Sequence, residues 1–428
     1  LAGEDAPAVA PQQPVDVNAL PYQRWLARNV QAHRDPRLAV VHLSFKRLGM
    51  APGDADAATM DAVADLADRF SAGEVRLTHE QNLLLPWVRR ADLPALYEAA
   101  RALRLAQPNI GLITDMISCP GGDFCALANA RSIPIAAALM ALYEDIDEAE
   151  DLGPIDLNMS GCINSCGHHH SGHIGILGVD KDGKEWYQIT LGGSDGSHLS
   201  GREGPGKIIG PAFSAAEVPD VVQAILNTYR ELRDGKEHFI DTVRRLAIAR
   251  AHTSTHMVHK ALHEIVSDNA TQAGSENSPS RLRFDFRHSS AVSGTQMDDI
   301  ESLVNDKVAE DLAVTTEVMP LEEARRQGAI ALFGEKYGKD VRVVTIGENF
   351  DKELCGGTHV PSTGHIGRIA LLGEGSIGSG VRRIDALVAD SAYHFQHKEH
   401  ALVSQLSALV GGRPEELPGR VESLMSRL

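Results

Sequence analysis

Ser160-Gly-Cys-Ile-Asn-Ser-Cys-Gly167 is the stretch that decides the fold of the first half of this chain, together with Ser118-Cys-Pro-Gly-Gly-Asp-Phe-Cys125 upstream. The two stretches contain four of the five cysteines: Cys119, Cys125, Cys162 and Cys166. Four soft thiolates suit an iron–sulfur cluster, and the glycines and the proline permit sharp turns that bring backbone amides close to sulfur. A structural zinc site, or cysteines that lie near a turn by chance, is the alternative interpretation.

Regular patterns extend outward from these two stretches. Upstream, we expect a strand over 38–45, a helix near 60–70, short strands near 75–78 and 83–88, and a helix over about 94–103. This order is similar to the β-α-β-β-α-β plan of a ferredoxin-like domain. Downstream, two apolar runs flank Asp180-Lys-Asp-Gly183 and predict a β-hairpin over 173–191, followed by a helix over 215–232.

Residues 21–245 resemble the C-terminal half of siroheme-containing sulfite and nitrite reductases. Besides the cysteines, the resemblance includes Thr78-His-Glu-Gln-Asn-Leu83, Ser132-Ile-Pro-Ile135, Gly167-His-His-His-Ser-Gly-His-Ile174 and Trp186-Tyr-Gln-Ile-Thr-Leu-Gly-Gly193. It implies that the four cysteines bind one [4Fe–4S] cluster. It also implies that Cys166 bridges the cluster to the siroheme iron and that Asn164 lies against the macrocycle. These cofactors would carry the six-electron reduction of sulfite or nitrite.

One departure from that family limits the expected activity. Its arginines and lysines that bind the substrate anion come largely from a first homologous half, which this sequence does not contain. Anion reduction needs positive charge at the open heme face. Reduction by this chain alone is therefore not expected, and the histidines of 168–173 are interpreted as packing around the cluster loop.

The fifth cysteine belongs to a second pattern. Cys355-Gly-Gly-Thr-His359 and His252-Thr-Ser-Thr-His256 together offer three imidazoles and one thiolate, a mixture that suits zinc. Histidines four apart lie on one face of a helix. Zinc peptidases place a glutamate base directly after the first histidine, and Thr253 in that position disfavours a peptidase. The histidine pair alone would be more typical of packing; its combination with Cys355 favours zinc.

Residues 248–428 resemble the editing domain of alanyl-tRNA synthetase. The resemblance rests on Ala251-His-Thr-Ser-Thr-His256, Thr271-Gln-Ala-Gly-Ser275, Arg281-Leu-Arg-Phe-Asp-Phe286, Leu332-Phe-Gly-Glu-Lys-Tyr-Gly338, Glu353-Leu-Cys-Gly-Gly-Thr-His-Val360 and Glu374-Gly-Ser-Ile-Gly-Ser-Gly-Val-Arg-Arg-Ile384. It implies that zinc held by His252, His256, Cys355 and His359 serves to hydrolyse the ester between serine or glycine and the terminal ribose of tRNA(Ala).

The same resemblance implies roles for other residues. Thr255 and Gln272 would shape the amino-acid pocket and, with Cys355, form the catalytic site. A glycine-rich loop over 373–380, with Arg382 and Arg383, is expected either to approach the tRNA backbone or to be a plain turn.

Length and composition fit a multidomain α+β protein. The 428 residues are predicted to form a ferredoxin-like half domain (21–108), a siroheme and [4Fe–4S]-binding α/β domain (109–247) and a zinc-containing editing domain (248–388). A loose segment (1–20) would precede them, and the start of a helical region (389–428) would follow. The net charge of −17 argues against a general nucleic-acid-coating role. A cytoplasmic protein is expected, since no stretch is apolar and long enough to span a membrane.

The expected function is hydrolysis of mischarged aminoacyl-tRNA at the 3′ end of tRNA(Ala), joined to the cluster-binding half of a reductase. Three alternatives remain open. The first is a sulfite or nitrite reductase subunit that another polypeptide and an electron donor complete. The second is a non-enzymatic cluster-based sensor, and the third is an artificial join of two pieces. The change of character near 245–250 has no linker, which keeps the last alternative open.

Overall fold

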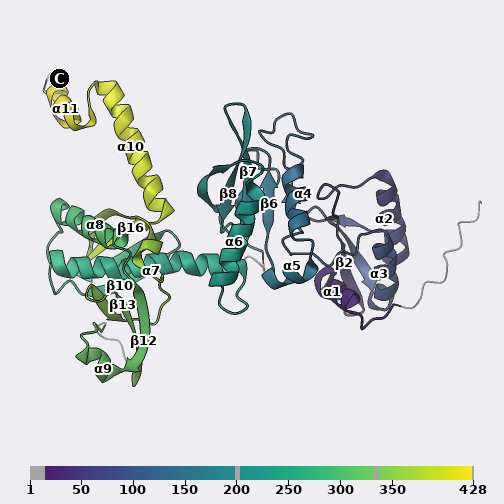
Figure 1. The fold of residues 1–428 in the computed structure, drawn as a ribbon, viewed down its shortest axis with the longest axis horizontal. Coiled ribbons are helices and arrows are strands. Elements are labelled where there is room, and N and C mark those ends of the chain that lie inside the picture. The colour runs from purple at the N-terminus through teal and green to yellow at the C-terminus, as the bar shows by residue number, and fades with distance from the viewer. Residues whose placement is uncertain (1–14, 198–202, 332–336, 427–428) are drawn as a thin grey trace, which may run out of the picture. The chain divides into compact units, whose positions relative to one another are not determined.

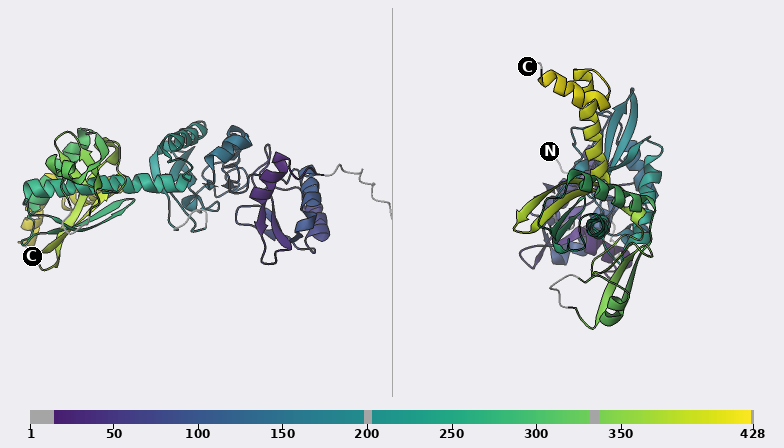
Figure 2. Two further views of the ribbon diagram at one scale, coloured as in Figure 1. Left: turned by 90° about the horizontal axis from the view of Figure 1, so that it is seen from below. Right: turned by 90° about the vertical axis from the view of Figure 1, so that its left-hand side faces the viewer.

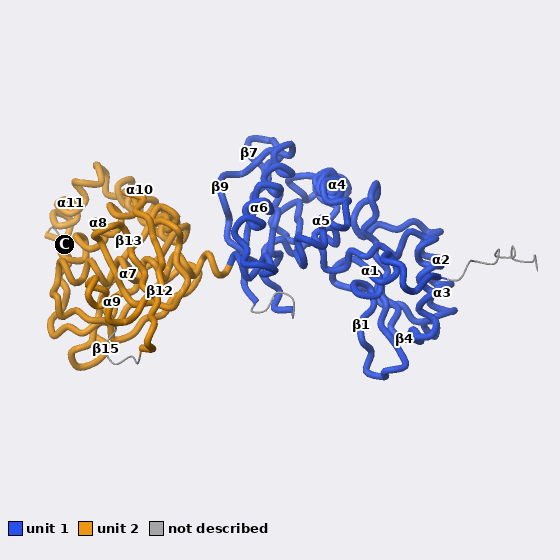
Figure 3. Tube along the Cα trace, turned by 60° about the horizontal axis from the view of Figure 1, so that its bottom comes forward, with its two compact units in different colours: residues 1–243 blue, residues 244–428 orange. Residues whose placement is uncertain are grey.

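The computed structural model describes residues 15–197, 203–331 and 337–426, and the chain divides into two compact units, 1–243 and 244–428 (Figures 1 and 3). Most of the predicted loose N-terminal segment, and residues 332–336 of the Leu332–Gly338 motif, lie outside the described residues. The predicted boundary at 247/248 falls inside one long helix, α7 (Phe239–Ile265). The right-hand view of Figure 2 looks nearly along it.

The first part of the N-terminal unit is a ferredoxin-like layer of one sheet and helices. Its elements are α1 (Leu20–Asn29), β1 (Val30–Ala32), β2 (Leu38–Leu43), α2 (Ala57–Phe70), β3 (Arg76–Leu77), β4 (Leu83–Arg89), η1 (Arg90–Asp92) and α3 (Leu93–Ala102). The sheet has the order β1-β2-β4-β3, with antiparallel neighbours. Trp25, Leu43, Leu85 and Leu96 are fully buried between the sheet and the helices.

The predicted β-α-β-β-α-β order is wrong at its last element. The edge position beside β2 is taken by β1, which comes before the first strand of the predicted order. Among the described residues, no strand of this sheet follows α3. The physical reason is local: β1 reaches β2 through a short turn and supplies the backbone hydrogen bonds that this edge needs.

The second part of the N-terminal unit is a five-stranded mixed sheet with helices. It comprises β5 (Ile117–Ser118), α4 (Ile133–Leu142), α5 (Ile146–Leu152), β6 (Leu157–Ser160), η2 (His169–Ser171), β7 (Ile174–Lys181), β8 (Lys184–Leu191), β9 (Lys207–Phe213) and α6 (Val218–Leu232). β5, β6 and β7 are parallel, and β8 and β9 continue the sheet antiparallel. The predicted hairpin is confirmed, because Lys181 pairs with Lys184 across a turn in which Asp182 and Gly183 have positive φ.

The C-terminal unit contains two sheets and α7. Its further elements are β10 (Gln272–Ser278), β11 (Arg281–Arg287), α8 (Gly294–Ala309), β12 (Val314–Pro320), α9 (Leu321–Arg326), β13 (Asp340–Ile346), β14 (Asp351–Leu354), η3 (Thr363–Ile366), β15 (Ile369–Gly378), β16 (Val381–Val388), α10 (Asp390–Val410), η4 (Pro414–Glu416) and α11 (Leu417–Met425). The sheet orders are β10-β11-β16-β15 and β12-β13-β14. One core of α7, α8 and sheet residues, including Leu262, Phe284, Ile300 and Ile384, holds the unit together.

Two expectations about this unit are wrong. The helix expected to carry His252 and His256 does not begin where the sequence changes character near 245–250: it begins at Phe239 and continues across that change. The predicted glycine-rich loop is largely strand: residues 373–378 belong to β15 and pair with β16, with irregular register at two points. Only residues near 379–380 form a turn, since a strand partner stabilises glycines that would otherwise favour a loop. In the described parts of the chain, every helix is too short or too polar to cross a bilayer.

Candidate metal and cofactor sites

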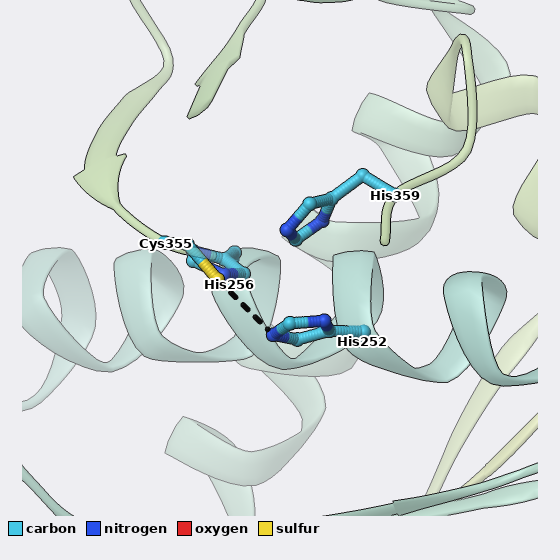
Figure 4. Close-up of side chains that lie close together, drawn as sticks. All are labelled: His252, His256, Cys355 and His359. Carbon is cyan, nitrogen blue, oxygen red and sulfur yellow. Dashed lines mark hydrogen bonds between the residues drawn. The ribbon is translucent and has the colours of Figure 1, made fainter. Parts of the chain in front are cut away.

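Four side chains converge in the C-terminal unit. His252 and His256 project from α7, Cys355 follows β14 directly, and His359 lies in the next loop (Figure 4). One ligand atom from each of the four residues lies within 4.8 Å of all the others. The Cys355 Sγ is 3.3 Å from His252 Nε2, and the ring centroids of His252 and His359 are 4.3 Å apart. Three imidazoles and a thiolate gathered this closely form a donor set that zinc favours.

A tight turn makes this convergence possible. A Cβ on Gly357 would lie 2.0 Å from His252 Cε1, so only glycine lets the backbone pass the ring. Arg342 on β13 fixes the same turn, because its Nη1 donates to the carbonyl oxygens of Cys355 (2.9 Å) and Gly357 (2.5 Å). The turn therefore holds the sulfur against α7.

Thr253, one residue after His252, connects the helix to His359. Its Oγ1 lies 3.0 Å from the Ala249 carbonyl oxygen, 3.1 Å from His359 Nδ1 and 3.2 Å from the Val360 amide nitrogen. The other ring nitrogen, His359 Nε2, is buried and has no hydrogen-bond partner among the described residues. A buried imidazole nitrogen without a partner among the described residues, beside a thiolate and two further imidazoles, fits a ligand of a cation.

Carboxylates lie directly behind the histidines. Glu353 Oε2 is 2.7 Å from His256 Nδ1, and Glu353 Oε1 is 2.6 Å from His259 Nδ1. The His256 contact is short but is not a hydrogen bond by its geometry, and it is an ion pair only when His256 is protonated. Asp351 is 3.7 Å from the same nitrogen, and both its oxygens are buried and form no hydrogen bond within the described parts of the chain. Glu353 is 3% exposed and His259 2%, so this layer is closed to water.

These surroundings shift the pKa values strongly. Burial would raise the pKa of the Cys355 thiol, but the imidazoles of His252, His256 and His359 outweigh it and lower the pKa to about 3. Burial also lowers the pKa of His359. Burial works against a charged Glu353, yet the imidazoles of His256 and His259 hold its pKa below the usual range. The sulfur is therefore available as thiolate, the form that binds metals.

Thr255 and Gln272, the predicted pocket residues, do not lie together. Thr255 is 4% exposed, and its Oγ1 lies 2.7 Å from Asn277 Oδ1 and 3.0 Å from the Ala251 carbonyl oxygen. One hydroxyl hydrogen cannot serve both oxygens, so the Asn277 amide is better placed with its NH2 group toward Thr255. Gln272 is at the other end of β10, roughly 15 Å along the strand from Asn277, and its amide bonds Ser275 Oγ.

The arginines expected to meet tRNA are engaged within the sheet. Arg382 is paired through two nitrogens with Glu374, and Arg383 likewise with Asp285. Arg281 is 2.6 Å from Asp385. A depression of about 340 Å³ over β15 and β16 is therefore lined by both charge signs, from Arg281, Arg383, Glu374 and Asp385, with glycine backbone between them.

The four cluster-type cysteines lie on two loops of the N-terminal unit. Cys119 follows β5 and Cys162 follows β6, and these strands are parallel neighbours, so both loops leave the same edge of the sheet. Cys119 and Cys162 are buried, Cys125 is partly buried and Cys166 is exposed. The predicted Asn164 is exposed beside Cys166. The two loops meet, since Cys119 N donates to the Met159 carbonyl oxygen and the amides of Asn129 and Ala130 donate to that of Gly161.

Glycines let these loops pass close to the sheet. A Cβ on Gly161 would lie 2.6 Å from the Ala130 carbonyl oxygen, and one on Gly167 would lie 1.8 Å from that of Met159. The Gly161 amide nitrogen is 3.1 Å from Cys119 Sγ, an example of a backbone amide directed at sulfur. These features fit a cluster held at the loops.

Gln81 connects the ferredoxin-like part to the first cysteine loop. Its side-chain amide both donates to and accepts from the backbone of Ser118, at 2.9 Å in each direction. Gln81 itself has φ of 58°, an uncommon conformation for a non-glycine residue. Beside it, Asn82 donates to Asp115 Oδ1 at 2.7 Å. The residue before Cys119 is thus fixed from outside its own sheet.

The histidine run after the second cysteine loop is partly packed, as expected from sequence. His169 is buried and His168 and His170 are exposed. Ser165 Oγ lies 3.1 Å from His169 Nδ1 and 2.8 Å from His170 Nδ1. The run forms local hydrogen bonds in the described structure.

Sequence reasoning missed the residues behind the ligands. Asp351 and Glu353 alternate along β14 and so share a face, Cys355 follows the strand at the same spacing of two, and His259 follows His256 by three on one helix. Strand and helix periodicity give this signal once β14 is recognised. Gln81 gave no comparable signal, because its contact depends on tertiary packing.

Three family profiles match the chain. The nitrite/sulfite reductase ferredoxin-like half domain matches residues 42–103. The nitrite and sulphite reductase 4Fe-4S domain matches residues 112–255. The threonyl and alanyl tRNA synthetase second additional domain matches residues 341–385.

Curated relatives match the C-terminal half. Alanine-tRNA ligase of Streptomyces avermitilis is 58% identical over 189 residues, 44% of this chain and 21% of that protein. That of Bifidobacterium longum is 56% identical over 190 residues, again 44% and 21%. The chain thus spans about a fifth of the length of these relatives. Among solved structures, Mycobacterium tuberculosis NirA protein is similar at 26% identity and a TM-score of 0.41, over 50% of this chain and 39% of that one.

The profile matches and the alanine-tRNA ligase relatives bear out the two resemblances drawn from the motifs. The chain therefore joins segments similar to the nitrite/sulfite reductase ferredoxin-like half domain and 4Fe-4S domain to a segment similar to the second additional domain of alanyl-tRNA synthetases.

Proposed function

We propose that the C-terminal unit hydrolyses seryl- and glycyl-tRNA(Ala). The observation that carries this proposal is the convergence of His252, His256, Cys355 and His359 within 4.8 Å in a domain related to alanine-tRNA ligases. Hydrolysis adds water across the ester: the bond between the acyl carbon and the ribose oxygen breaks, the amino acid leaves, and the tRNA regains its terminal hydroxyl. Zinc held by the four residues would supply Lewis acidity toward the ester or the water.

The chain's own residues provide position and selectivity. The low pKa of Cys355 keeps its sulfur in the anionic form that a metal binds. Thr255 and Asn277, beside His256, place a hydroxyl and an amide where a small polar amino acid can be recognised. The Thr255 oxygen, which donates to Ala251 and accepts from Asn277, can accept one further hydrogen bond, and a seryl hydroxyl that donates it is favoured over alanine, which cannot. Gln272 lies at the opposite end of β10 from Asn277, so it would contact a substrate that extends along the whole strand.

The test is deacylation by the purified full chain. We expect seryl-tRNA(Ala) and glycyl-tRNA(Ala) to be hydrolysed faster than alanyl-tRNA(Ala). Cys355→Ala should remove bound zinc and lower the rate by about 1,000-fold, since Lewis-acid assistance contributes several kcal/mol. His359→Ala should lower zinc content and rate in the same way, and His397→Ala, which removes an exposed imidazole from α10, is its matched control and should keep both. A zinc-free chain with an undiminished rate would contradict the proposal.

A second proposal concerns the N-terminal unit. The two cysteine-containing loops follow the adjacent parallel strands β5 and β6, so they begin side by side. This arrangement favours a [4Fe–4S] cluster on Cys119, Cys125, Cys162 and Cys166. In that arrangement exposed Cys166 is the thiolate available to a siroheme iron, with Asn164 beside it. A cluster coupled to siroheme would supply single electrons for reduction of a bound oxyanion.

Iron and acid-labile sulfide content test this second proposal. Anaerobic reconstitution should give about four irons per chain, and each single Cys→Ala change at the four positions should lower that number. Cys355→Ala should leave it unchanged, because this thiol belongs to the other unit. Iron loading that depended on Cys355 would contradict the assignment.

A further inference from the structure

The histidines of the C-terminal site are held by a second set of polar side chains, and we infer that Thr253 and Glu353 preset the metal-binding tautomers of His359 and His256. Both act as positioning residues. This inference rests on the proposed zinc site and adds the groups that orient its ligands. The two contacts come from different elements, Thr253 from α7 and Glu353 from β14.

The hydrogen-bond inventory of Thr253 determines the proton on His359. A hydroxyl has one hydrogen and accepts up to two more hydrogen bonds. The Val360 amide must donate to Oγ1 (3.2 Å), and the Ala249 carbonyl oxygen must accept from it (3.0 Å). The third contact, His359 Nδ1 at 3.1 Å, is then satisfied only if Nδ1 carries a hydrogen.

A proton on Nδ1 leaves the lone pair of a neutral imidazole on Nε2. This is the buried atom for which the described residues offer no hydrogen-bond partner. The hydroxyl therefore directs the free lone pair of His359 to the point where Cys355, His252 and His256 also converge. Thr253 is fully buried, so water does not replace its hydroxyl.

Glu353 does the same for His256 by charge. A carboxylate oxygen 2.7 Å from Nδ1 repels a ring lone pair and attracts a ring N–H, so the proton resides on Nδ1 and the lone pair on Nε2. The second carboxylate oxygen is occupied by His259 Nδ1 at 2.6 Å. The two rings hold Glu353 from two sides, and neither carboxylate oxygen is available to rotate away.

The contact with His259 explains why glutamine cannot replace Glu353. A glutamine presents one oxygen and one NH2 group, and two N–H donors face this position. One ring must then lose its acceptor or reverse its tautomer. If His256 reverses, Nε2 becomes protonated and no longer binds a metal.

An alternative use of these groups is a second cation bound by His256, Asp351 and Glu353, whose ligand atoms also lie within 4.8 Å of one another. That site would need the lone pair of His256 Nδ1, and the ring would then have to coordinate through both nitrogens. The positioning role requires one metal per C-terminal unit, whereas the alternative requires two.

The experiment measures zinc in the full chain by competition with a chromophoric chelator, and records the visible spectrum after Co²⁺ substitution. We expect Glu353→Gln and Thr253→Val each to raise the zinc Kd by about 10- to 100-fold, the usual effect of losing a residue that orients a ligand. The Co²⁺ bands should shift, because a turned imidazole changes the coordination geometry. The double variant should raise the Kd further than either single change, because the two residues orient different ligands of the same ion.

Two matched controls separate positioning from general damage. Thr228→Val removes a threonine that makes the same hydrogen bond to the carbonyl four residues earlier, but on the exposed face of α6. Glu310→Gln neutralises an exposed glutamate that follows α8. Both should keep the wild-type Kd and spectrum. If Thr253→Val fails to fold by circular dichroism, the Kd and spectrum of Glu353→Gln decide alone.

The outcomes distinguish this inference from the proposed function. A wild-type chain that takes up no zinc overturns both. A wild-type chain that binds zinc and deacylates, with folded variants whose Kd stays within twofold, overturns only the positioning role. A second zinc equivalent that is lost in Glu353→Gln while the first stays tight also overturns it, because Glu353 would then be a ligand.

Discussion

The two sulfur-containing regions of this chain differ in how completely the polypeptide forms them. Around Cys355, four donor atoms lie within 4.8 Å, and buried Thr253 and Glu353 stand behind them. Around Cys119 and Cys162, the sulfurs are distributed over two loops, and Phe124 (83% exposed) and Ile163 (82%) face solvent on those same loops. A site the size of one ion can be formed by protein atoms alone. A site for a large cofactor takes part of its internal contacts from the cofactor.

Metal removal should give the largest effect and confine it to one region. At a zinc concentration 1,000 times the Kd, binding stabilises the native state by about 4 kcal/mol. Chelation should therefore lower hydrogen-exchange protection across α7, β13 and β14 and leave the sheet of β5 to β8 unchanged. Equal loss of protection in both regions would show that the sites are not energetically separate.

Gly167→Ala should have the next largest effect and reach only the cysteine loops. Its Cβ would lie 1.8 Å from a backbone oxygen of Met159, so the strand end or the loop must move, at about 3 kcal/mol. We expect lower denaturant stability and less iron after reconstitution, with zinc content intact. Gly204→Ala, which meets nothing within 4 Å, is the control. Normal iron loading in Gly167→Ala would contradict the close approach.

Gly357→Ala should weaken the ion site specifically. The new Cβ would push the His252 ring, 2.0 Å away, off its position as a ligand. Zinc affinity should fall about 100-fold, or about 2.7 kcal/mol, measured by chelator competition. The neighbouring Gly356→Ala meets no atom within 4 Å and should bind as the wild type does. Similar affinities for the two variants would show that His252 relaxes freely.

Gln81→Ala should give the smallest of these effects. It removes two hydrogen bonds to the Ser118 backbone without changing the cost of the positive φ, so we expect about 1–2 kcal/mol lower stability of the N-terminal unit. Thermal unfolding together with the rate of iron loss from reconstituted protein provides the measurement. An iron-loss rate equal to that of the wild type would indicate that Cys119 is positioned by its own sheet alone.

Much of the fold could be predicted because it depends on local periodicity. The 173–191 hairpin and the strands that became β2 and β4 follow from alternation and turn residues. The predictions are wrong where contacts beyond the local sequence determine the element. β1 takes the edge position beside β2, glycines 373–378 form part of strand β15, and α7 continues through a change of sequence character. In each case a partner distant in sequence, or helix continuation, outweighs the local pattern.

The sequence by itself determined which histidines join Cys355, and it predicts that the other four cysteines share one centre, because ligand chemistry limits the useful spacings and residue types of each set. Only the tertiary structure decided which residues contact these ligands and hold them in place. Three kinds of contact join separate elements. They are the ion pairs of Arg382 and Arg383, the contacts of Glu353 with two imidazoles, and the hydrogen bonds between Gln81 and Ser118. Their geometry depends on strand register and helix packing across the chain, which local spacing does not encode.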